Sequence, residues 1–125
     1  KKETGGEFMR NISILHNSRW GKSRATLQLL RDSNIEPIII NYLLSVPRKD
    51  ELRSISKKLN MHPSLWIRKS EKDYKNNNLG KYLNDEDKLY DAMIKYPKII
   101  ERPIVIEGDK AIIGRPPENI YTLIK

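Results

Sequence analysis

The residues best suited to chemistry lie in one basic segment near the N-terminus, residues 16–24, which read His-Asn-Ser-Arg-Trp-Gly-Lys-Ser-Arg. The segment follows a short apolar run, residues 12–15, and precedes a stretch with helical periodicity. A strand that leads through small and basic residues into a helix forms an anion site, because free backbone N–H groups and the positive helix end point at the turn. The segment therefore predicts that a small anion binds between a strand and a helix.

The chain is basic and contains no cysteine. It has 24 Lys and Arg against 16 Asp and Glu, a formal net charge of +8. This balance fits a nucleic acid, a membrane surface, a small anion or a surface adapted for solubility. No acidic residue occurs between Glu7 and Asp32, so the predicted loop and first helix are themselves positive. The absence of cysteine excludes disulfides and thiolate metal sites, and the two histidines, far apart in sequence, predict no metal site.

The length is that of one domain. We interpret residues 1–8 as the remnant of an expression tag, because they are small, polar and without pattern, and Met9 as the native start. Residues 9–125 suffice for a single modest core. No apolar run reaches the ~20 residues of a membrane span, and no signal peptide is evident. We expect a cytoplasmic monomer that does not contact membranes.

The order of elements predicts an α/β fold. Strands over residues 12–16 and 38–42 flank a helix over 21–33, which is a βαβ unit with parallel strands. A hairpin with its turn at residues 107–110 and a terminal helix opened by Pro116 and Pro117 complete a thioredoxin-like, four-stranded mixed sheet, βαβ…ββα. Between the halves we predict a helical insert that covers the basic loop, with a helix from Ser45, a short helix over residues 64–68, a loop at 76–78 and a helix capped by Asn84.

Residues 16–24 closely resemble the active-site loop of the glutaredoxin-dependent arsenate reductases, His-Asn-Pro-x-Cys-x-x-Ser-Arg. Two positions differ, since Ser18 replaces the proline and Trp20 replaces the nucleophilic cysteine. The resemblance covers nearly all of residues 9–125 and is strongest in three further segments, Leu-Trp-Ile-Arg-Lys-Ser-Glu at 65–71, Pro-Lys-Ile-Ile-Glu-Arg-Pro-Ile at 97–104 and Ile-Gly-Arg-Pro-Pro-Glu at 113–118. By these segments the chain most resembles the short, chromosomal branch of the family.

The resemblance implies that Arg68, Arg102 and Arg115 surround the reacting position and hold the oxyanion. Arginine suits this task because its planar guanidinium binds an oxyanion with two parallel hydrogen bonds. Arg24, in the first turn of the predicted helix, adds a further positive group close to the loop. A single arginine of this kind is more often a solvated surface charge, but three in three matching segments favour a site.

Two other positions carry expectations from the resemblance. His16 matches the family residue that helps to keep the cysteine as a thiolate, and without the cysteine the favoured role is a hydrogen-bonded histidine at a strand end. Pro103 matches the cis-proline that thioredoxin-like folds place opposite the active loop, so we expect a cis bond between Arg102 and Pro103 that faces the loop.

Trp20 decides which chemistry remains. The family reduces arsenate with glutathione as co-substrate and glutaredoxin as partner, and it requires a thiolate nucleophile, whereas indole offers only a weak N–H donor. The sequence therefore predicts an arsenate-reductase-family protein without reductase activity that still binds arsenate or a similar oxyanion. The alternative is a non-catalytic oxyanion- or protein-binding module, such as an Spx-like regulator, whose class shares this fold and binds RNA polymerase. Nucleic acid is a weaker third alternative, because aromatic residues are sparse. Cysteine and tryptophan codons differ by one base, so a natural and an introduced change at Trp20 both stay open.

Overall fold

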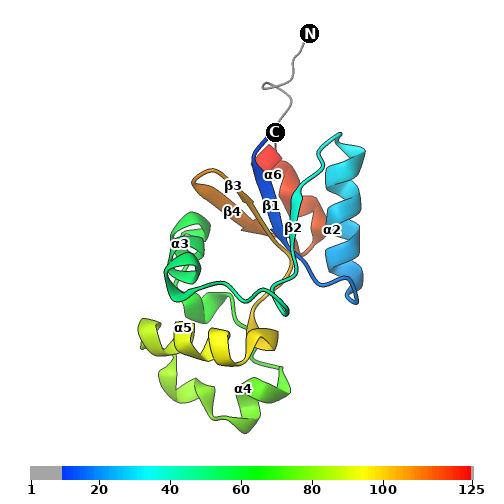
Figure 1. The fold of residues 1–125 in the computed structure, drawn as a ribbon. Helices are drawn as coiled ribbons and strands as arrows, with labels where there is room; N and C mark the ends of the chain where they lie inside the picture. The colour runs from blue at the N-terminus through cyan, green and yellow to red at the C-terminus, as the bar shows by residue number, and fades with distance from the viewer. Residues whose placement is uncertain (1–9, 125) are drawn as a thin grey trace.

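A four-stranded mixed sheet forms the centre of the protein in the computed structural model, which describes residues 10–124 (Figure 1). Residues 1–8, interpreted above as a tag remnant, and Met9, interpreted as the native start, lie outside the described residues. The strand order is β2 (Ile38–Ile40), β1 (Ile12–Leu15), β3 (Ile104–Glu107) and β4 (Lys110–Ile113). β1 pairs parallel with β2 and antiparallel with β3, and β3 pairs antiparallel with β4. The predicted fold class is therefore confirmed.

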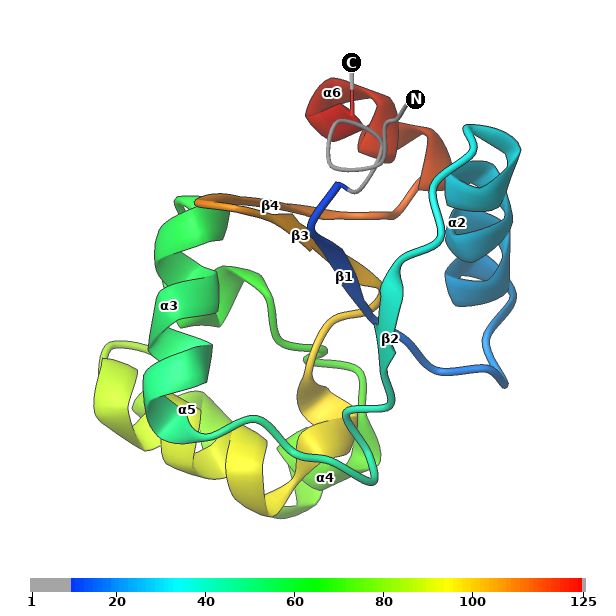
Figure 2. The same ribbon diagram turned by 45° about the horizontal axis from the view of Figure 1, so that its top comes forward.

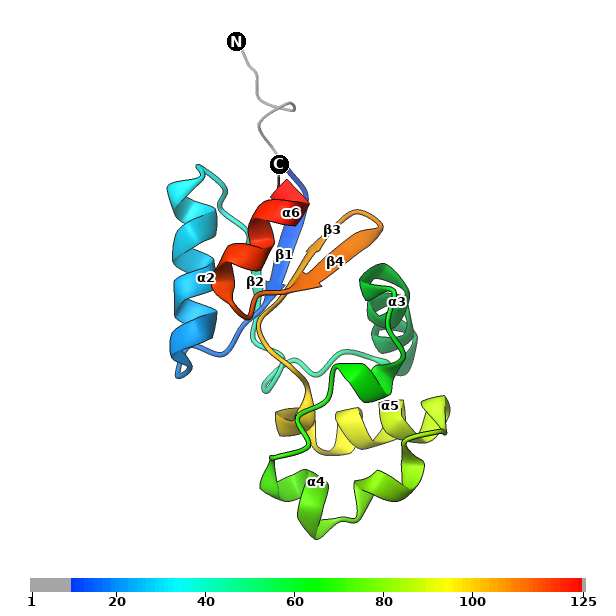
Figure 3. The same cartoon turned by 180° about the vertical axis from the view of Figure 1, so that it is seen from behind.

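Helices cover both sides of the sheet (Figures 2 and 3). On one side lie α2 (Gly21–Asp32) and, at the end of the chain, the 3₁₀ turn η4 (Pro117–Ile120) with α6 (Tyr121–Ile124). On the other lies the helical insert, made of α3 (Lys49–Leu59), η1 (Pro63–Leu65), α4 (Lys72–Asn76), η2 (Leu79–Tyr82), α5 (Glu86–Lys95) and η3 (Pro97–Ile99). Within residues 10–124, every helix is too short or too polar to cross a membrane.

The alternation of side chains along β1 divides the interior into two cores. Ile12 and Ile14 pack with Leu27 and Leu30 of α2, whereas Leu15 packs with the apolar side chains of the insert. β1 and β3 are central strands and therefore contribute to both cores. β2 is an edge strand, so Ile38 and Ile39 remain 60% and 43% exposed despite their apolar character. The loop between β1 and α2 therefore starts from the most buried strand of the sheet.

Several predicted element boundaries are wrong. α3 begins at Lys49 rather than near Ser45, because Arg48 occupies the N-cap position and its N–H donates to Glu51 Oε1 at 2.9 Å. α5 is capped by Asp85 instead of Asn84, since the Asp85 carboxylate accepts from the Lys88 N–H. β2 ends at Ile40, two residues earlier than predicted.

The predicted helix over residues 64–68 is also wrong, for a tertiary reason. Only the turn η1 forms, and Ile67 then pairs with Ile100 in an isolated antiparallel bridge. The Arg68 N–H donates to the Ile99 carbonyl at 2.6 Å, and Trp66 is fully buried with its Nε1–H donated to Ser56 Oγ. These partners come from other segments of the chain and hold Ile67 in a β bridge instead of a helix. The result is that Arg68 enters the site from a strand-like backbone.

Candidate anion site

The loop between β1 and α2 is anchored through one buried serine. Ser23 Oγ lies 2.6 Å from His16 Nδ1 and accepts the Asn17 N–H at 3.0 Å. The Ser23 hydroxyl has one proton and two lone pairs, so it satisfies His16 Nδ1 in either tautomer of the imidazole while it accepts the Asn17 N–H. Burial lowers the pKa of His16, and the positive charges of Arg31 and Arg24 lower that pKa further. His16 is thus a hydrogen-bonded histidine at a strand end, as expected for a chain without the cysteine.

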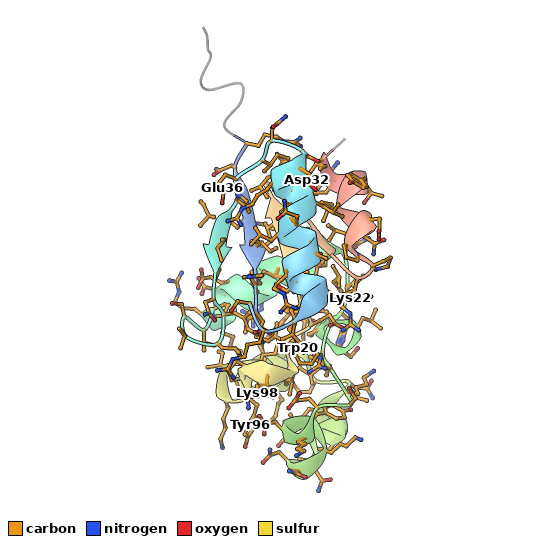
Figure 4. The ribbon with its side chains drawn as sticks, turned by 90° about the vertical axis from the view of Figure 1, so that its right-hand side faces the viewer. Trp20, Lys22, Asp32, Glu36, Tyr96 and Lys98 are labelled. Atoms are coloured by element: carbon orange, nitrogen blue, oxygen red, sulfur yellow. The ribbon has the colours of Figure 1, made fainter. Side chains whose placement is uncertain are left out.

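Trp20 occupies the N-cap position of α2 and packs against two arginines. The guanidinium carbon of Arg102 lies 3.5 Å from the centroid of the indole ring, and that of Arg68 lies 4.7 Å away. Trp20 is 41% exposed and caps no backbone N–H with its side chain. Figure 4 places Trp20 at the lower end of α2, above the segment that carries Lys98. The indole therefore occupies the mouth of the site, where the family resemblance places a thiol.

Arg102 is a buried cation with unused donors. It is only 3% exposed, and its Nε and Nη2 atoms are buried without a hydrogen-bond partner. Burial lowers the pKa of Arg102, as do the charges of Arg68 and Arg115, while Tyr42 and Glu101 act in the opposite direction. A buried donor without an acceptor costs about 1–3 kcal/mol, and more when the group is charged. The site therefore favours any acceptor that reaches this guanidinium.

A second buried polar group faces the same place. The hydroxyl of Tyr42 is buried and has no hydrogen-bond partner. Burial raises the pKa of Tyr42, although the neighbouring Arg102 charge and the Asn17 side chain oppose that shift. The phenol therefore stays neutral and offers an O–H donor. Tyr42 and Arg102 are therefore neighbouring groups that both carry buried donors without a partner.

These groups line a cavity of about 260 Å³. Its wall is formed by Asn17, Arg19, Trp20, Tyr42, Leu43, Arg68, Glu71, Lys98 and Arg102. Four of these side chains are cationic and one is a carboxylate. The carboxylate of Glu71 pairs with Arg68 Nη1 at 2.8 Å, which leaves a positive excess in the cavity. An arrangement of this kind attracts anions.

The remaining predicted site residues are placed differently. Arg24 is exposed and donates from Nη1 to the Ser18 carbonyl at 3.0 Å, so it braces the loop and does not line the cavity. Arg115 is directed to Glu101, with 2.9 Å between Nη1 and Oε1, and is likewise absent from the cavity wall. The bond between Arg102 and Pro103 is cis, as predicted, and a second cis bond precedes Pro116. The structure thus brings Arg68 and Arg102 together with Trp20, while Arg115 lies farther out.

Six of the nine residues in the cavity wall were not predicted as site residues, and Tyr42 and Lys98 are two of them. Tyr42 follows β2, and the carboxyl ends of the parallel strands β1 and β2 lie side by side, so this position carries a signal for a site. Lys98 lies in the matched segment that contains Arg102. Nothing in the sequence around Lys98 distinguishes it from an ordinary surface lysine.

Comparison with known proteins identifies the family of the chain. The model of the ArsC family matches residues 15–123. An arsenate reductase of Haemophilus influenzae is 41% identical over 115 residues, which cover 91% of this chain and 99% of that protein. Among solved structures, an arsenate reductase from Vibrio cholerae superposes with a TM-score of 0.88 at 38% identity, covering 92% of this chain and 98% of that one.

A second solved structure is also similar to this chain over almost its whole length. A putative arsenate reductase from Yersinia pestis has a TM-score of 0.85 at 39% identity, covering 90% of this chain and 99% of that one. Both the sequence and the three-dimensional arrangement are thus shared along almost the whole length. The chain belongs to the ArsC family.

Proposed function

We propose that this ArsC-family protein binds a small anion beside Arg102 and does not reduce arsenate. The observation that carries the proposal is the contact between Trp20 and Arg102, at 3.5 Å, at the position where the family resemblance places the nucleophile. An indole cannot attack arsenate, and the sequence contains no cysteine to replace it. Glutathione and glutaredoxin, the reductants that the resemblance implies, consequently have no thiol adduct to act on. We further propose that the protein works as a cytoplasmic monomer.

The anion-binding part rests on unsatisfied donors and on charge. Arg102 and Tyr42 carry buried donors without partners, and Arg68 and Lys98 add positive charge to the same cavity. Relatives named arsenate reductase make a tetrahedral oxyanion the first candidate. The structure differs from a reductase site at the nucleophile and retains basic side chains around it.

The reductase part is tested in an assay with arsenate, glutathione and glutaredoxin. The unaltered chain should show no turnover above a blank without protein, whereas Trp20→Cys should gain measurable activity. Trp20→Ser is the matched control, because it opens the same space without a thiolate. Turnover by the unaltered chain contradicts the proposal. A folded but inactive Trp20→Cys protein shows that the arginines no longer support the family reaction.

The binding part is tested by thermal melts in sulfate and in chloride at equal ionic strength. Sulfate should raise the melting temperature more than chloride, because a ligand at many times its Kd stabilises the native state by about 1–3 kcal/mol. The sulfate-specific rise should disappear in Arg68→Ala and persist in Arg31→Ala, whose ion pair with Glu36 lies at the other end of α2. Identical melts in both salts would count against a functional anion site.

A further inference from the structure

The arginines without a carboxylate partner gather at one end of the molecule. Within residues 10–124, every arginine except Arg19, Arg24 and Arg102 forms an ion pair with a carboxylate. Arg19 and Arg24 are exposed and belong to the loop after β1 and to the first turn of α2. Lys22 and Lys98, which Figure 4 shows on the same side of the molecule, are exposed as well. This end of the protein therefore carries positive charge that other side chains leave uncompensated, and it attracts an acidic partner.

Apolar side chains are exposed among these cations. Trp20 and Leu43 share the cavity wall with Arg19 and Lys98, and the side chain of Trp20 is partly exposed. Leu44, which follows Leu43, is the most exposed large apolar side chain in the described part of the chain. Apolar groups beside unpaired cations are typical of a surface that contacts another protein. The phosphates and sugars that a nucleic acid presents offer little to an exposed leucine.

Trp20 is held in place before any partner binds. The guanidinium carbon of Arg102 lies 3.5 Å from the centroid of the indole ring, and that of Arg68 lies 4.7 Å away. A side chain fixed by such contacts loses little conformational freedom on association, which lowers the entropic cost of binding. Tryptophan and arginine are also enriched among the residues that contribute most to the affinity of protein interfaces. The exposed part of the indole is therefore a preformed contact for an apolar side chain.

We infer that an acidic segment of another protein docks on the exposed surface made of Arg19, Trp20, Lys22, Leu44 and Lys98. Carboxylates of the segment pair with the cations, and an apolar side chain next to them packs on the exposed part of the indole. Each exposed ion pair contributes little by itself, so the segment carries several carboxylates. This inference goes beyond the proposed binding of a small anion, because it uses exposed side chains and does not require access to the buried donors beside the cavity.

The two tryptophans allow a specific test by NMR titration of the ¹⁵N-labelled chain. Trp66 is fully buried and donates its Nε1–H to Ser56 Oγ, so its indole signal is an internal reference, whereas that of Trp20 reports on the surface. The probes are the capped peptide Glu-Glu-Leu-Phe-Glu-Glu and a peptide of equal charge with two serines at its centre. The first should shift the Trp20 signal, leave that of Trp66 unchanged and bind about tenfold more tightly than the second, because it buries apolar surface.

Variants separate the docking surface from general attraction by a basic protein. Arg19→Glu and Lys98→Glu should each weaken binding of the first peptide by about threefold to tenfold. Lys110→Glu makes the same change in net charge and should leave binding unaltered. Lys110 is exposed in β4 beside the hairpin turn, and the register of β1 with β3 places this turn at the opposite end of the sheet from the loop after β1. Leu44→Ser should weaken the first peptide by about threefold and leave the serine peptide unchanged.

The outcomes decide between this inference and its alternatives. The inference is overturned if neither peptide shifts the Trp20 signal, if both bind equally, or if Lys110→Glu weakens binding as much as Arg19→Glu does. Vesicles of phosphatidylglycerol or an oligothymidine that shift the Trp20 signal at lower concentration than the first peptide would overturn the assignment to a protein. The proposed function fails separately: a sulfate-specific rise in melting temperature without peptide binding supports the anion site alone, and peptide binding without that rise supports the docking surface alone.

Discussion

Replacing Trp20 by alanine is the most direct test of how the site is held together. The side chain is 41% exposed, so a little over half of it is covered in the native state. Taking the buried part as roughly 150 Å², at about 25 cal/mol per Å², gives an upper estimate of about 4 kcal/mol for the lost burial. The desolvated contact with Arg102 adds about 2 kcal/mol.

One effect opposes this loss. In the unaltered protein the Arg102 donors are buried without partners. When the indole is removed, water reaches these donors, and the hydration of the charged group offsets a large part of the lost burial and contact energy. We therefore expect Trp20→Ala to lower the free energy of unfolding by about 2–4 kcal/mol in chloride. In sulfate, the difference in unfolding free energy between Trp20→Ala and the unaltered protein should be smaller, because an anion can occupy the space that the ring leaves.

Urea unfolding of both proteins in chloride and in sulfate, at equal ionic strength, measures these quantities. Leu44→Ala is the matched control, because Leu44 is apolar but 83% exposed, and a surface change of this kind alters stability by no more than about 0.5 kcal/mol. If Trp20→Ala were as stable as Leu44→Ala in chloride, the stack on Arg102 would contribute nothing. Equal stabilisation of both proteins by sulfate would show that the indole does not compete with an anion.

Three further predictions concern the scaffold around the site. Ser23→Ala should cost about 2–4 kcal/mol in urea unfolding, because it leaves His16 Nδ1 and the Asn17 N–H without partners. Because the pKa of His16 is lowered in the folded protein, the unfolded chain binds a proton first as the pH falls, so the stability linked to neutral His16 is present above about pH 6.5 and is lost at lower pH. His16→Asn should therefore lose less unfolding free energy between pH 7.5 and 5.5 than the unaltered chain. An equal loss in both proteins would contradict this prediction. Gly114→Ala should cost about 1–3 kcal/mol, because its Cβ would lie 2.8 Å from two Thr26 atoms, whereas Gly21→Ala, with 3.8 Å to its nearest neighbour, should be tolerated.

Local pattern was sufficient to predict the sheet and its helices. The β-branched run that contains β2, the helical periodicity after Gly21 and the turn around Gly108, where φ is +61°, each carry their own signal. The segment around Trp66 carries none, because its non-helical backbone depends on hydrogen bonds to Ser56 and Ile99, which lie in other segments of the chain. Such tertiary contacts override local propensity, and they also set where Arg68 enters the site.

The arginines illustrate the same limit at the level of side chains. The matching segments predicted Arg68, Arg102 and Arg115 equally as site residues. A long side chain, however, pairs with an acceptor that the fold places within its reach. Arg115 forms an ion pair with Glu101, and Arg68 forms one with Glu71. Arg102 instead stacks on the ring of Trp20 and lies beside Tyr42. No residue spacing encodes this difference. The distinction between a paired and an unpaired arginine, on which the proposed anion site depends, appears only in three dimensions.

The exchange of a thiol for an indole leaves the charge of the site unbalanced. A full negative charge about 4 Å from Arg102 would be worth about 4 kcal/mol at an effective dielectric constant of about 20. The π face that Trp20 presents supplies about half of that, roughly 2 kcal/mol. Arg102 is therefore undercompensated, in agreement with its two buried donors that lack partners. In the proposed function, loss of the nucleophile therefore removes the route to reduction and at the same time leaves a cavity that a bound anion would stabilise.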